Sequence, residues 1–474
     1  MSSVKTLFWH DYETWGATPS SDKPSQFAGV RTDESLNIVG EPLVIYCRPT
    51  SDCLPQPQAC LITGITPQKA LSEGVSEPLF FQKIHEQLSE PGTCGVGYNS
   101  IRFDDEVSRY GFYRNFFDPY EREWKNGNSR WDIIDMVRLV YALRPDTLNW
   151  PLRENDLPSF KLELLSAENG LEHTAAHDAL SDVKATIALA KLIKQRQPKL
   201  YDYCYELRNK QQVNTLIDIV KRKPLLHISS RFSAKQGCAA LVVPLAKHPK
   251  NNNSVICYDL SVNPTPLLTL STEEILERVF VKQGELPEGV ERIPLKEVHI
   301  NKSPVLATPK LLDDTAAKRL GIDKIACNQH WEQLRNVDIN TKLTTLYSQQ
   351  HFPPSTDPEK QLYDGFINNN DRQLFDVIRQ AAPESLSSFS DQLQDKRLKA
   401  LLFRYRARHY NETLTEEEQA QWEEWRYVHL TDVEAGGSIT LENYFTELDK
   451  LSASGAVDLN IIEALRDHGD SLLV

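Results

Sequence analysis

A chain of 474 residues is longer than one hydrophobic core usually supports, because cores stop growing at roughly 250 to 300 residues, so we expect two or three domains. The composition, 40% hydrophobic and 25% charged, is typical of globular proteins, and no apolar run approaches the ~20 residues that cross a bilayer. The net charge of −13 counts weakly against a polyanionic ligand, since a carboxylate cluster that holds divalent cations becomes locally electropositive.

The N-terminal segment has no charged stretch followed by an apolar stretch and a cleavage site of small residues, so it does not resemble a secretory signal. We therefore expect a cytoplasmic protein that does not bind a membrane. The eight cysteines form no Cys-x-x-Cys pair and accompany no histidine at zinc-finger spacing, which predicts isolated, reduced thiols.

The first 190 residues alternate between strand and helix patterns. The expected strands cover residues 7–13, 36–47 and 93–98, and the expected helices cover residues 133–143, 159–167 and 178–194. The second strand is interpreted as a hairpin that turns near Gly40, and the third leads into a helix that begins near Phe103. The helix over residues 133–143 stops before Pro145, because the residue before a proline disfavours helical backbone angles. This alternation predicts an α/β domain with a mixed sheet over residues 1–197.

The pattern changes after residue 197. Short β-type runs separated by Pro, Gly and Asn cover residues 224–229, 239–244, 254–260 and 294–300. A β-rich domain with helical additions is therefore predicted over residues 198–352. Beyond a proline-rich stretch the chain is expected to be helical over residues 353–474, and Thr415 with Glu418 forms a capping box ahead of a long amphipathic segment.

The first acidic motif is the pair Asp11 and Glu13 in the first expected strand. Residues two apart on a strand point to the same face of a sheet, so these carboxylates lie side by side. Neighbouring anions repel each other unless a cation lies between them, and the pair therefore favours ligation of a hard metal ion. Taken alone, the motif is explained better by two solvated acids at an exposed strand end.

Two further motifs lie where elements meet. Asp104 stands where a strand gives way to a helix, at the sheet edge where α/β sites gather, although the helix dipole alone also favours an acid there. His177 precedes the expected helix and Asp182 lies more than one turn inside it, so a loop imidazole and a helical carboxylate can converge. His177 is suited to accept a proton from water, and the small residues Ala175, Ala176 and Ala179 leave room for a ligand.

Together these motifs supply four carboxylates and one histidine to one α/β domain. The set fits a phosphodiesterase with two Mg²⁺ ions roughly 3.5 to 4 Å apart, which activate water and stabilise the departing 3′-oxygen. In this interpretation Asp11 bridges both ions. Glu13, Asp104 and Asp182 complete the ligand set, and His177 is the general base.

The order of these motifs resembles the proofreading-type exonuclease superfamily with four acidic ligands and a histidine. Longer segments are similar to the bacterial exodeoxyribonuclease I family over nearly the whole chain, and these segments are HDYETWG, QFAGVRTD, LPQPQACLITGITPQ, GYNSIRFDDEVSR, NSRWDIIDMVRLVYALRPD, KRKPLLHIS, HINKSPVLA and FRYRAR. The resemblance implies a ribonuclease H-like exonuclease domain, an SH3-like β-rich domain and an all-helical C-terminal domain. It also implies a monomeric, processive 3′-to-5′ exonuclease of DNA repair and recombination, which uses Mg²⁺, with Mn²⁺ as a substitute, to degrade single-stranded DNA to 5′-mononucleotides.

The resemblance implies a protein partner as well, the C-terminal tail of single-stranded-DNA-binding protein. Arg144 and Tyr203 align with the pocket that receives this tail, and Arg144 can pair with the tail carboxylate. Thr308 and Asp313 depart from the family pattern, which has a glutamine and an arginine at these positions. Lys310 is expected to compensate.

Side chains beside the motifs are candidates for contact with DNA. They are Glu13, Trp15, Tyr98, Arg102, Phe103, Phe160 and Lys161. An aromatic ring can stack on any base, a contact worth ~1 to 3 kcal/mol. Lys161 replaces an arginine of the family, so its phosphate contact would not be forked. The segment after Phe403, with Arg404, Arg406 and Arg408, either contacts the strand or anchors the C-terminal helices, and we favour anchoring.

Three other functions stay open on the residues alone. An exoribonuclease with the same catalytic set would differ in its tolerance of the 2′-hydroxyl group. A non-catalytic binding module would keep its function without the acidic residues. A generic acidic interaction protein would show no Mg²⁺-dependent thermal shift.

Overall fold

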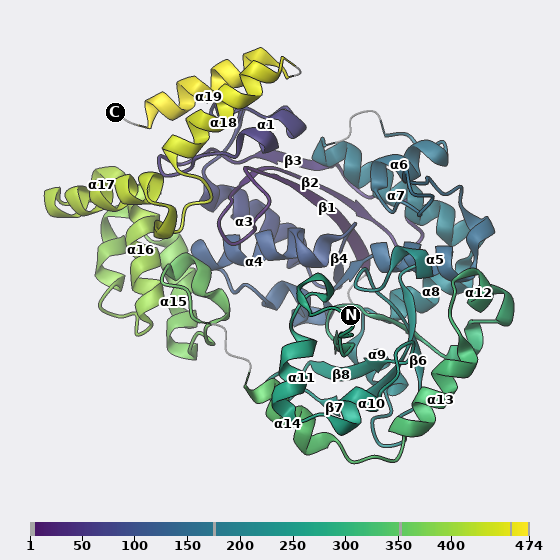
Figure 1. Cartoon of the computed structure of the whole chain (residues 1–474). Coiled ribbons are helices and arrows are strands. Elements are labelled where there is room, and N and C mark those ends of the chain that lie inside the picture. Colours follow the sequence, from purple (N-terminus) through teal and green to yellow (C-terminus); the bar gives the residue numbers. More distant parts are fainter. Residues whose placement is uncertain (1–4, 174–176, 350–352, 456, 473–474) are drawn as a thin grey trace. The chain divides into compact units, whose positions relative to one another are not determined.

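The computed structural model describes residues 5–173, 177–349, 353–455 and 457–472 (Figure 1). The chain divides into two compact units. The first consists of Met1–Ser129, His173–Ile187 and Pro353–Val474, and the second of Arg130–Glu172 and Ala188–Phe352. Because one compact unit can contain more than one domain, the domain boundaries expected at residues 197/198 and 352/353 stay predictions.

The N-terminal sheet has the strand order β3-β2-β1-β4-β5. Its strands are β1 (Thr6–Thr14), β2 (Pro24–Thr32), β3 (Leu43–Tyr46), β4 (Thr93–Gly97) and β5 (Ser129–Asp132). Strand β1 pairs antiparallel with β2 and parallel with β4, so the sheet is mixed, as the sequence predicts.

The prediction of a hairpin over residues 36–47 is wrong. The antiparallel partner of β1 is β2, and only Leu43–Tyr46 of the expected hairpin is a strand, which pairs with β2 instead. Strand β2 is buried on both faces, so it lacks the alternation of polar and apolar residues by which a half-buried strand is recognised. Gly29 in its middle allows close packing, because a Cβ there would lie 2.2 Å from the ring of Phe8.

Helices α3 (Glu77–Leu88) and α4 (Asp104–Arg114) cover one face of this sheet (Figure 1). Phe8, Tyr12 and Phe27 of the sheet belong to one core cluster with Phe80 of α3 and Phe112 of α4. The rings of Tyr12 and Phe27 meet edge to face with centroids 4.8 Å apart. This packing fixes which face of β1 is turned away from the helices.

The remaining helices of the first unit lie in two groups. They are α1 (Pro57–Thr63) and α2 (Pro67–Glu73) from the N-terminal part, and α15 (Asn369–Gln380), α16 (Lys396–His409), α17 (Glu416–Thr431), α18 (Leu441–Ser454) and α19 (Leu459–Ser471) from the C-terminal part. The C-terminal part is helical, as expected, and the capping box of Thr415 and Glu418 is confirmed. Helix α7 (Ala179–Arg196) begins in the first unit and continues into the second.

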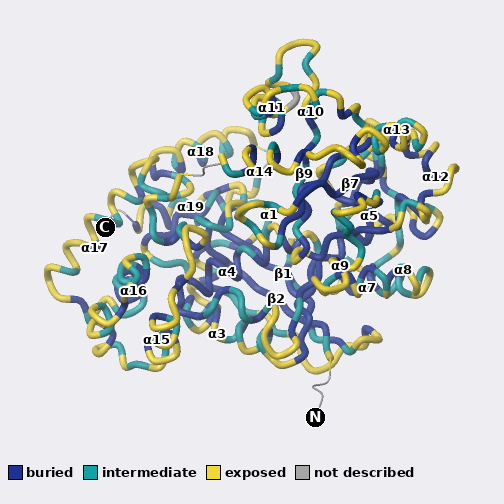
Figure 2. The backbone as a smooth tube through the Cα atoms, turned by 90° about the horizontal axis from the view of Figure 1, so that it is seen from below, coloured by how far each residue is buried: buried dark blue, intermediate teal, exposed yellow. Residues whose placement is uncertain are grey.

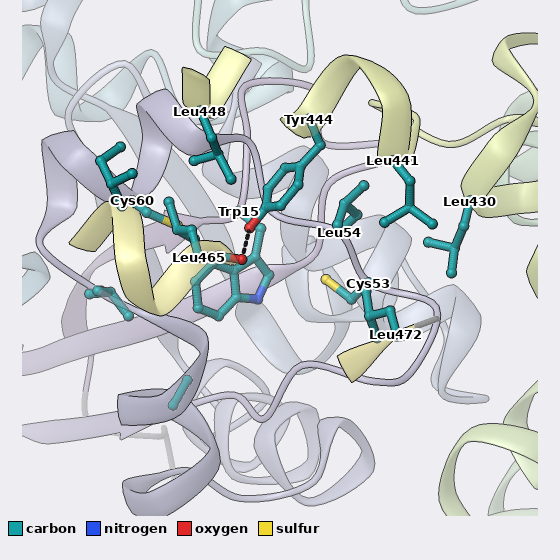
Figure 3. Packing of buried hydrophobic residues seen from close by; sticks show 13 residues of the cluster. Trp15, Cys53, Leu54, Cys60, Leu430, Leu441, Tyr444, Leu448, Leu465 and Leu472 are labelled. Atoms are coloured by element: carbon teal, nitrogen blue, oxygen red, sulfur yellow. Dashed lines mark hydrogen bonds between the residues drawn. The ribbon is translucent and has the colours of Figure 1, made fainter. Parts of the chain in front are cut away.

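A hydrophobic cluster joins α18 and α19 to the N-terminal part of the first unit. Figure 3 shows the ring of Trp15 among Tyr444, Leu465 and Cys53, and the Tyr444 hydroxyl donates to the Leu465 carbonyl at 2.7 Å. Trp15 is only 2% exposed, so its ring has no surface on which a base could stack. This position removes Trp15 from the candidate DNA contacts.

The arginines of the segment after Phe403 lie on α16 and form ion pairs. Arg408 bonds to Asp52 at 2.8 Å and to Glu359 at 2.5 Å, and Arg404 bonds to Glu359 at 3.0 Å. We call these four residues the arginine clasp. Arg406 pairs with Glu418 at 2.5 Å. All three arginines are therefore held by carboxylates within the first unit, which supports the anchoring interpretation.

The second unit contains an antiparallel sheet of order β10-β6-β7-β8-β9. Its strands are β6 (Leu225–Ile228), β7 (Ala239–Lys247), β8 (Ser254–Asp259), β9 (Leu295–His299) and β10 (Val305–Ala307). The first four were expected from the sequence, whereas β10 has only three residues and escaped prediction. The strands of both sheets are mostly buried, and exposed residues gather on outer helices such as α17 (Figure 2).

Helices complete the second unit. They are α5 (Ile134–Leu143), α6 (Leu162–Glu168), α8 (Pro198–Glu206), α9 (Lys210–Leu216), α10 (Thr265–Thr269), α11 (Thr272–Val279), α12 (Asp314–Arg319), α13 (Lys324–Leu334) and α14 (Asn340–Ser348). Helix α5 ends before Arg144 and Pro145, as expected. All eight cysteines are buried free thiols. Within the described ranges, no helix combines the length and apolar character needed to cross a membrane.

Candidate active site

Strand β1 presents two carboxylates on the face opposite α3 and α4. Because side chains alternate along a strand, the packing of Phe8 and Tyr12 against the helices turns Asp11 and Glu13 to the other face. Glu13 is 9% exposed and Asp11 is partly buried. The sequence therefore predicted their shared face correctly.

Asp104 reaches the same strand from the first residue of α4. The pairing of β1 with β4 ends at Trp9 and Val96, so β1 runs on without that neighbour. The backbone N–H of Tyr12, in this extension, donates to Asp104 Oδ1 at 3.1 Å. A turn with Asn99 in the left-handed conformation, at φ +63°, connects β4 to the helical segment, and asparagine tolerates that conformation better than most residues. This arrangement buries Asp104 between the carboxylate-bearing end of β1 and α4.

His177 and Asp182 come from the start of α7. Asp178 caps this helix, because its Oδ1 accepts the Ser181 N–H at 3.0 Å. His177, just before the cap, is exposed and left-handed at φ +64°. The ligand atoms of Glu13, His177 and Asp182 all lie within 4.8 Å of one another. The structure thus brings together side chains that are separated by nearly 170 residues in the sequence.

The charges of these carboxylates act on one another. Burial, followed by the charges of Asp104 and Glu13, raises the pKa of Asp11 well above its usual range. Burial and the nearby charges of Asp182 and Asp104 likewise raise the pKa of Glu13. Asp104 is therefore electrostatically close to both carboxylates of β1, and all four acids act as one cluster.

Asp182 has a partner that the sequence reasoning missed. His173 Nε2 lies 2.5 Å from Asp182 Oδ1. Burial raises the pKa of Asp182, but the hydrogen bond from His173 opposes that rise. Asp178 was missed too, and its charge adds to those acting on Asp11 and Glu13. Of the small residues expected near His177, Ala179 is buried, while Ala175 and Ala176 lie outside the described residues.

The cluster suits a divalent cation. Buried and partly buried carboxylates repel each other here, as the raised pKa values of Asp11 and Glu13 show, and a cation between them would remove that repulsion. Carboxylate oxygens are the preferred ligands of Mg²⁺ and Mn²⁺, and an imidazole also suits softer divalent ions such as Zn²⁺. The donor set therefore fits the group that the sequence implies.

The remaining DNA-contact candidates occupy varied positions. In the first unit Arg102 is exposed, Tyr98 is half-buried, and Phe103 packs partly against the core cluster of α3 and α4. In the second unit the Lys161 side chain is 69% exposed and lies 3.4 Å from Glu163, whereas Phe160 is buried. The exposure of Arg102 and Lys161 leaves both cations accessible to a ligand.

The residues expected to bind a protein partner lie in the second unit. Arg144 is exposed and donates to the Leu143 carbonyl at 2.6 Å, and the Tyr203 hydroxyl donates to Leu306 at 2.6 Å. Thr308 and Asp313, which depart from the family pattern, each accept a hydrogen bond at a helix start. Their side chains therefore have local structural partners.

Comparison with known proteins places this site in a family. Residues 8–190 match the family described as Exonuclease, residues 208–349 match the Exonuclease I SH3-like domain, and residues 356–472 match the Exonuclease I C-terminal domain. The exodeoxyribonuclease I of Haemophilus influenzae is 43% identical over 471 residues, which cover 99% of each chain. The chain belongs to the exodeoxyribonuclease I family.

Solved structures of the family share the complete fold. Exonuclease I from Methylocaldum szegediense superposes with a TM-score of 0.95 at 47% identity, over 99% of this chain and 100% of that one. The zinc-bound form of the complex between Escherichia coli exonuclease I and single-stranded DNA superposes with a TM-score of 0.94 at 44% identity, over 100% of both chains. The expected order of an exonuclease domain, an SH3-like domain and a helical C-terminal domain is thereby confirmed.

Proposed function

We propose that the protein degrades single-stranded DNA from its 3′ end, releasing 5′-mononucleotides with the help of two Mg²⁺ ions. The observation that carries this proposal is the convergence of Glu13, His177 and Asp182 within 4.8 Å of one another, beside Asp11 and Asp104, in a chain of the exodeoxyribonuclease I family. Relatives that bind single-stranded DNA and a divalent metal ion support the choice of substrate and cofactor.

Four carboxylates would hold the metal ions. Asp11, whose charge interacts with those of the other three, would hold the ions together with Glu13, Asp104 and Asp182. Bound divalent cations supply Lewis-acid stabilisation of the charge that develops at the scissile phosphate, and Mn²⁺ is expected to replace Mg²⁺. The hydrogen bond from Tyr12 N–H fixes Asp104 Oδ1, so this carboxylate is held in place before any ligand arrives.

His177 is the candidate general base. Its position outside α7 and its exposure leave the imidazole accessible to water, while its ring stays near Glu13 and Asp182. A neutral imidazole accepts a proton more readily than a carboxylate engaged with a cation does. His177 would therefore take the proton from the attacking water.

Side chains of both units are candidates to hold the strand. Arg102 and Lys161 are the candidate phosphate contacts, and Tyr98 and Phe103 are the candidate stacking partners of the bases. Arg144 and Tyr203 are the candidate contacts for the tail of single-stranded-DNA-binding protein. We further propose a cytoplasmic monomer that acts in DNA repair and recombination, as the family resemblance implies.

The decisive experiment uses end-labelled oligonucleotides as single strands and duplexes, with and without Mg²⁺. We expect stepwise shortening of the single-stranded DNA from its 3′ end, only with the metal, near-complete loss for Asp11→Ala and a loss of roughly 10²- to 10⁴-fold for His177→Ala. Degradation of a matched RNA oligonucleotide in preference to the DNA would indicate an exoribonuclease instead. Shortening from the 5′ end, or full activity of Asp11→Ala, would overturn the proposal.

A further inference from the structure

A second histidine touches the candidate ligand set without belonging to it. The side chain of His173 is 6% exposed, and its Nε2 lies 2.5 Å from Asp182 Oδ1. An ionised carboxylate can only accept hydrogen bonds, so a neutral His173 must carry its proton on Nε2 to donate here. This contact occupies one oxygen of Asp182 in a defined direction.

Asp182 does not cap its own helix, because Asp178 performs that task for α7 through the Ser181 N–H. The contact with His173 therefore orients the Asp182 carboxylate and is not needed to start the helix.

We propose that His173 is a positioning residue that orients Asp182 toward the bound metal ions. This inference rests on the proposed function, because it concerns the same ligand set. Groups that hydrogen-bond to metal ligands fix the ligand's orientation, and their removal typically lowers metal affinity or activity by about 10- to 100-fold. His173 acts in this way through Asp182, and it is neither the general base nor a ligand.

Substitutions that mimic one ring nitrogen at a time test the geometry. The amide nitrogen of glutamine reaches about as far as Nε2 of histidine, whereas that of asparagine reaches only about as far as Nδ1. His173→Gln therefore keeps a donor for Asp182, and His173→Asn places its donor too far away. His468→Ala is a matched control, because it removes a buried imidazole that bonds at 3.1 Å to a backbone carbonyl, that of Cys53.

Mn²⁺ binding to the full chain, measured by electron paramagnetic resonance, is the first readout. We expect His173→Ala to weaken binding by about 10- to 100-fold, His173→Gln to retain most of the affinity, and His173→Asn to behave like alanine. His468→Ala should bind as the wild type does. In an Asp182→Asn background, adding His173→Ala should change the affinity no further, because the carboxylate that it orients is gone.

Steady-state kinetics on a single-stranded oligonucleotide give the second readout. His173→Ala should lower kcat while KM stays near the wild-type value, since the side chain positions a metal ligand and not the DNA. Wild-type Mn²⁺ affinity in His173→Ala, or a further loss in the Asp182→Asn background, would refute the inference. If circular dichroism shows that His173→Ala does not fold, equal affinities of the glutamine and asparagine variants would refute it too. A wild-type protein without nuclease activity would refute the proposed function instead, and the Mn²⁺ affinities would still be measurable.

Discussion

The ionised form of Glu13 is destabilised in the metal-free protein. Burial and the charges of Asp182 and Asp104 raise its pKa, which means that the folded chain disfavours the ionised form that a metal ion needs. A shift of one pKa unit corresponds to about 1.4 kcal/mol, so the cluster opposes folding when no cation is bound. The carboxylates proposed to bind the metal ions therefore lower the free energy of unfolding of the metal-free protein.

Replacing Glu13 with glutamine should stabilise the metal-free protein. Glu13→Gln keeps the shape of the side chain and removes one of the repelling charges, so we expect the free energy of unfolding in EDTA at neutral pH to rise by about 1 kcal/mol or more. The stabilisation by added Mg²⁺ should shrink, and nuclease activity should fall. Urea unfolding with and without Mg²⁺ measures both effects. Glu86→Gln, at an exposed position on α3, is the control and should change stability by no more than about 0.5 kcal/mol. A Glu13→Gln protein less stable than the wild type in EDTA would contradict the argument.

At the scale of residues, the sequence pointed to a metal site only when the acidic motifs were considered together. Asp11 and Glu13 are adjacent on one face because strands alternate, a rule that the sequence alone provides. The contact of His173 with Asp182 was not predictable, because it depends on how the chain approaches α7 from outside the helix. The burial of Trp15 was not predictable either, because its neighbours Tyr444 and Leu465 lie more than 400 residues away in the sequence.

At the level of elements, the patterns along the chain predicted α4 to α7, the helical C-terminal region and four strands of the second sheet, but they did not locate α1, α2 and α3. They failed at β2, which is buried on both faces and therefore shows no alternation, and at β10, which is too short to carry a pattern. The anchoring of α16 was favoured over DNA contact but could not be decided without structure. The carboxylates that pair with Arg408 are those of Asp52 and Glu359. Both are distant from α16 in the sequence, so the sequence alone could not identify them.

The arginine clasp should contribute strongly to the stability of the first unit. Burial disfavours a charged Asp52, yet Arg408 and Lys23 beside it hold its pKa well below its usual range. Removing one partner of a buried ion pair leaves the other charge uncompensated, so we expect Arg408→Ala to cost about 3 to 5 kcal/mol in the free energy of unfolding. The exposed pair of Arg466 and Asp449 provides the matched control, and Arg466→Ala should cost about 1 kcal/mol or less. Equal losses in urea unfolding of the two variants would show that the clasp does not anchor α16.

At the scale of the whole molecule, both units contain buried or partly buried histidines that are favoured in the neutral form. Burial lowers the pKa of His85 and of His409 in the first unit to about 4, and that of His227 in the second unit to about 3. Unfolding would return each group to a pKa near 6.5. Between pH 6.5 and about 4 these histidines therefore bind protons in the unfolded chain that they do not bind in the folded chain, so their contribution lowers the stability as the pH falls. The arginine clasp steepens the acid end of this slope, because Asp52 and Glu359 stay ionised in the folded chain while the same carboxyls of the unfolded chain begin to take up protons as the pH approaches about 4.

A single substitution can isolate the contribution of one histidine to this slope. Raised pKa values in the carboxylate cluster act in the opposite direction, so the total slope of the wild type is a sum, and the informative quantity is the difference between wild type and His85→Gln. Glutamine does not titrate, and whatever packing it loses against Phe112 and Phe117 is the same at every pH. We therefore expect the free energy of unfolding of His85→Gln to fall less steeply between pH 6.5 and 4.5, by up to about 1.4 kcal/mol per pH unit. Urea unfolding in EDTA at several pH values measures this difference. Parallel curves for the two proteins would mean that His85 is protonated in the folded state, and burial would then not control its charge.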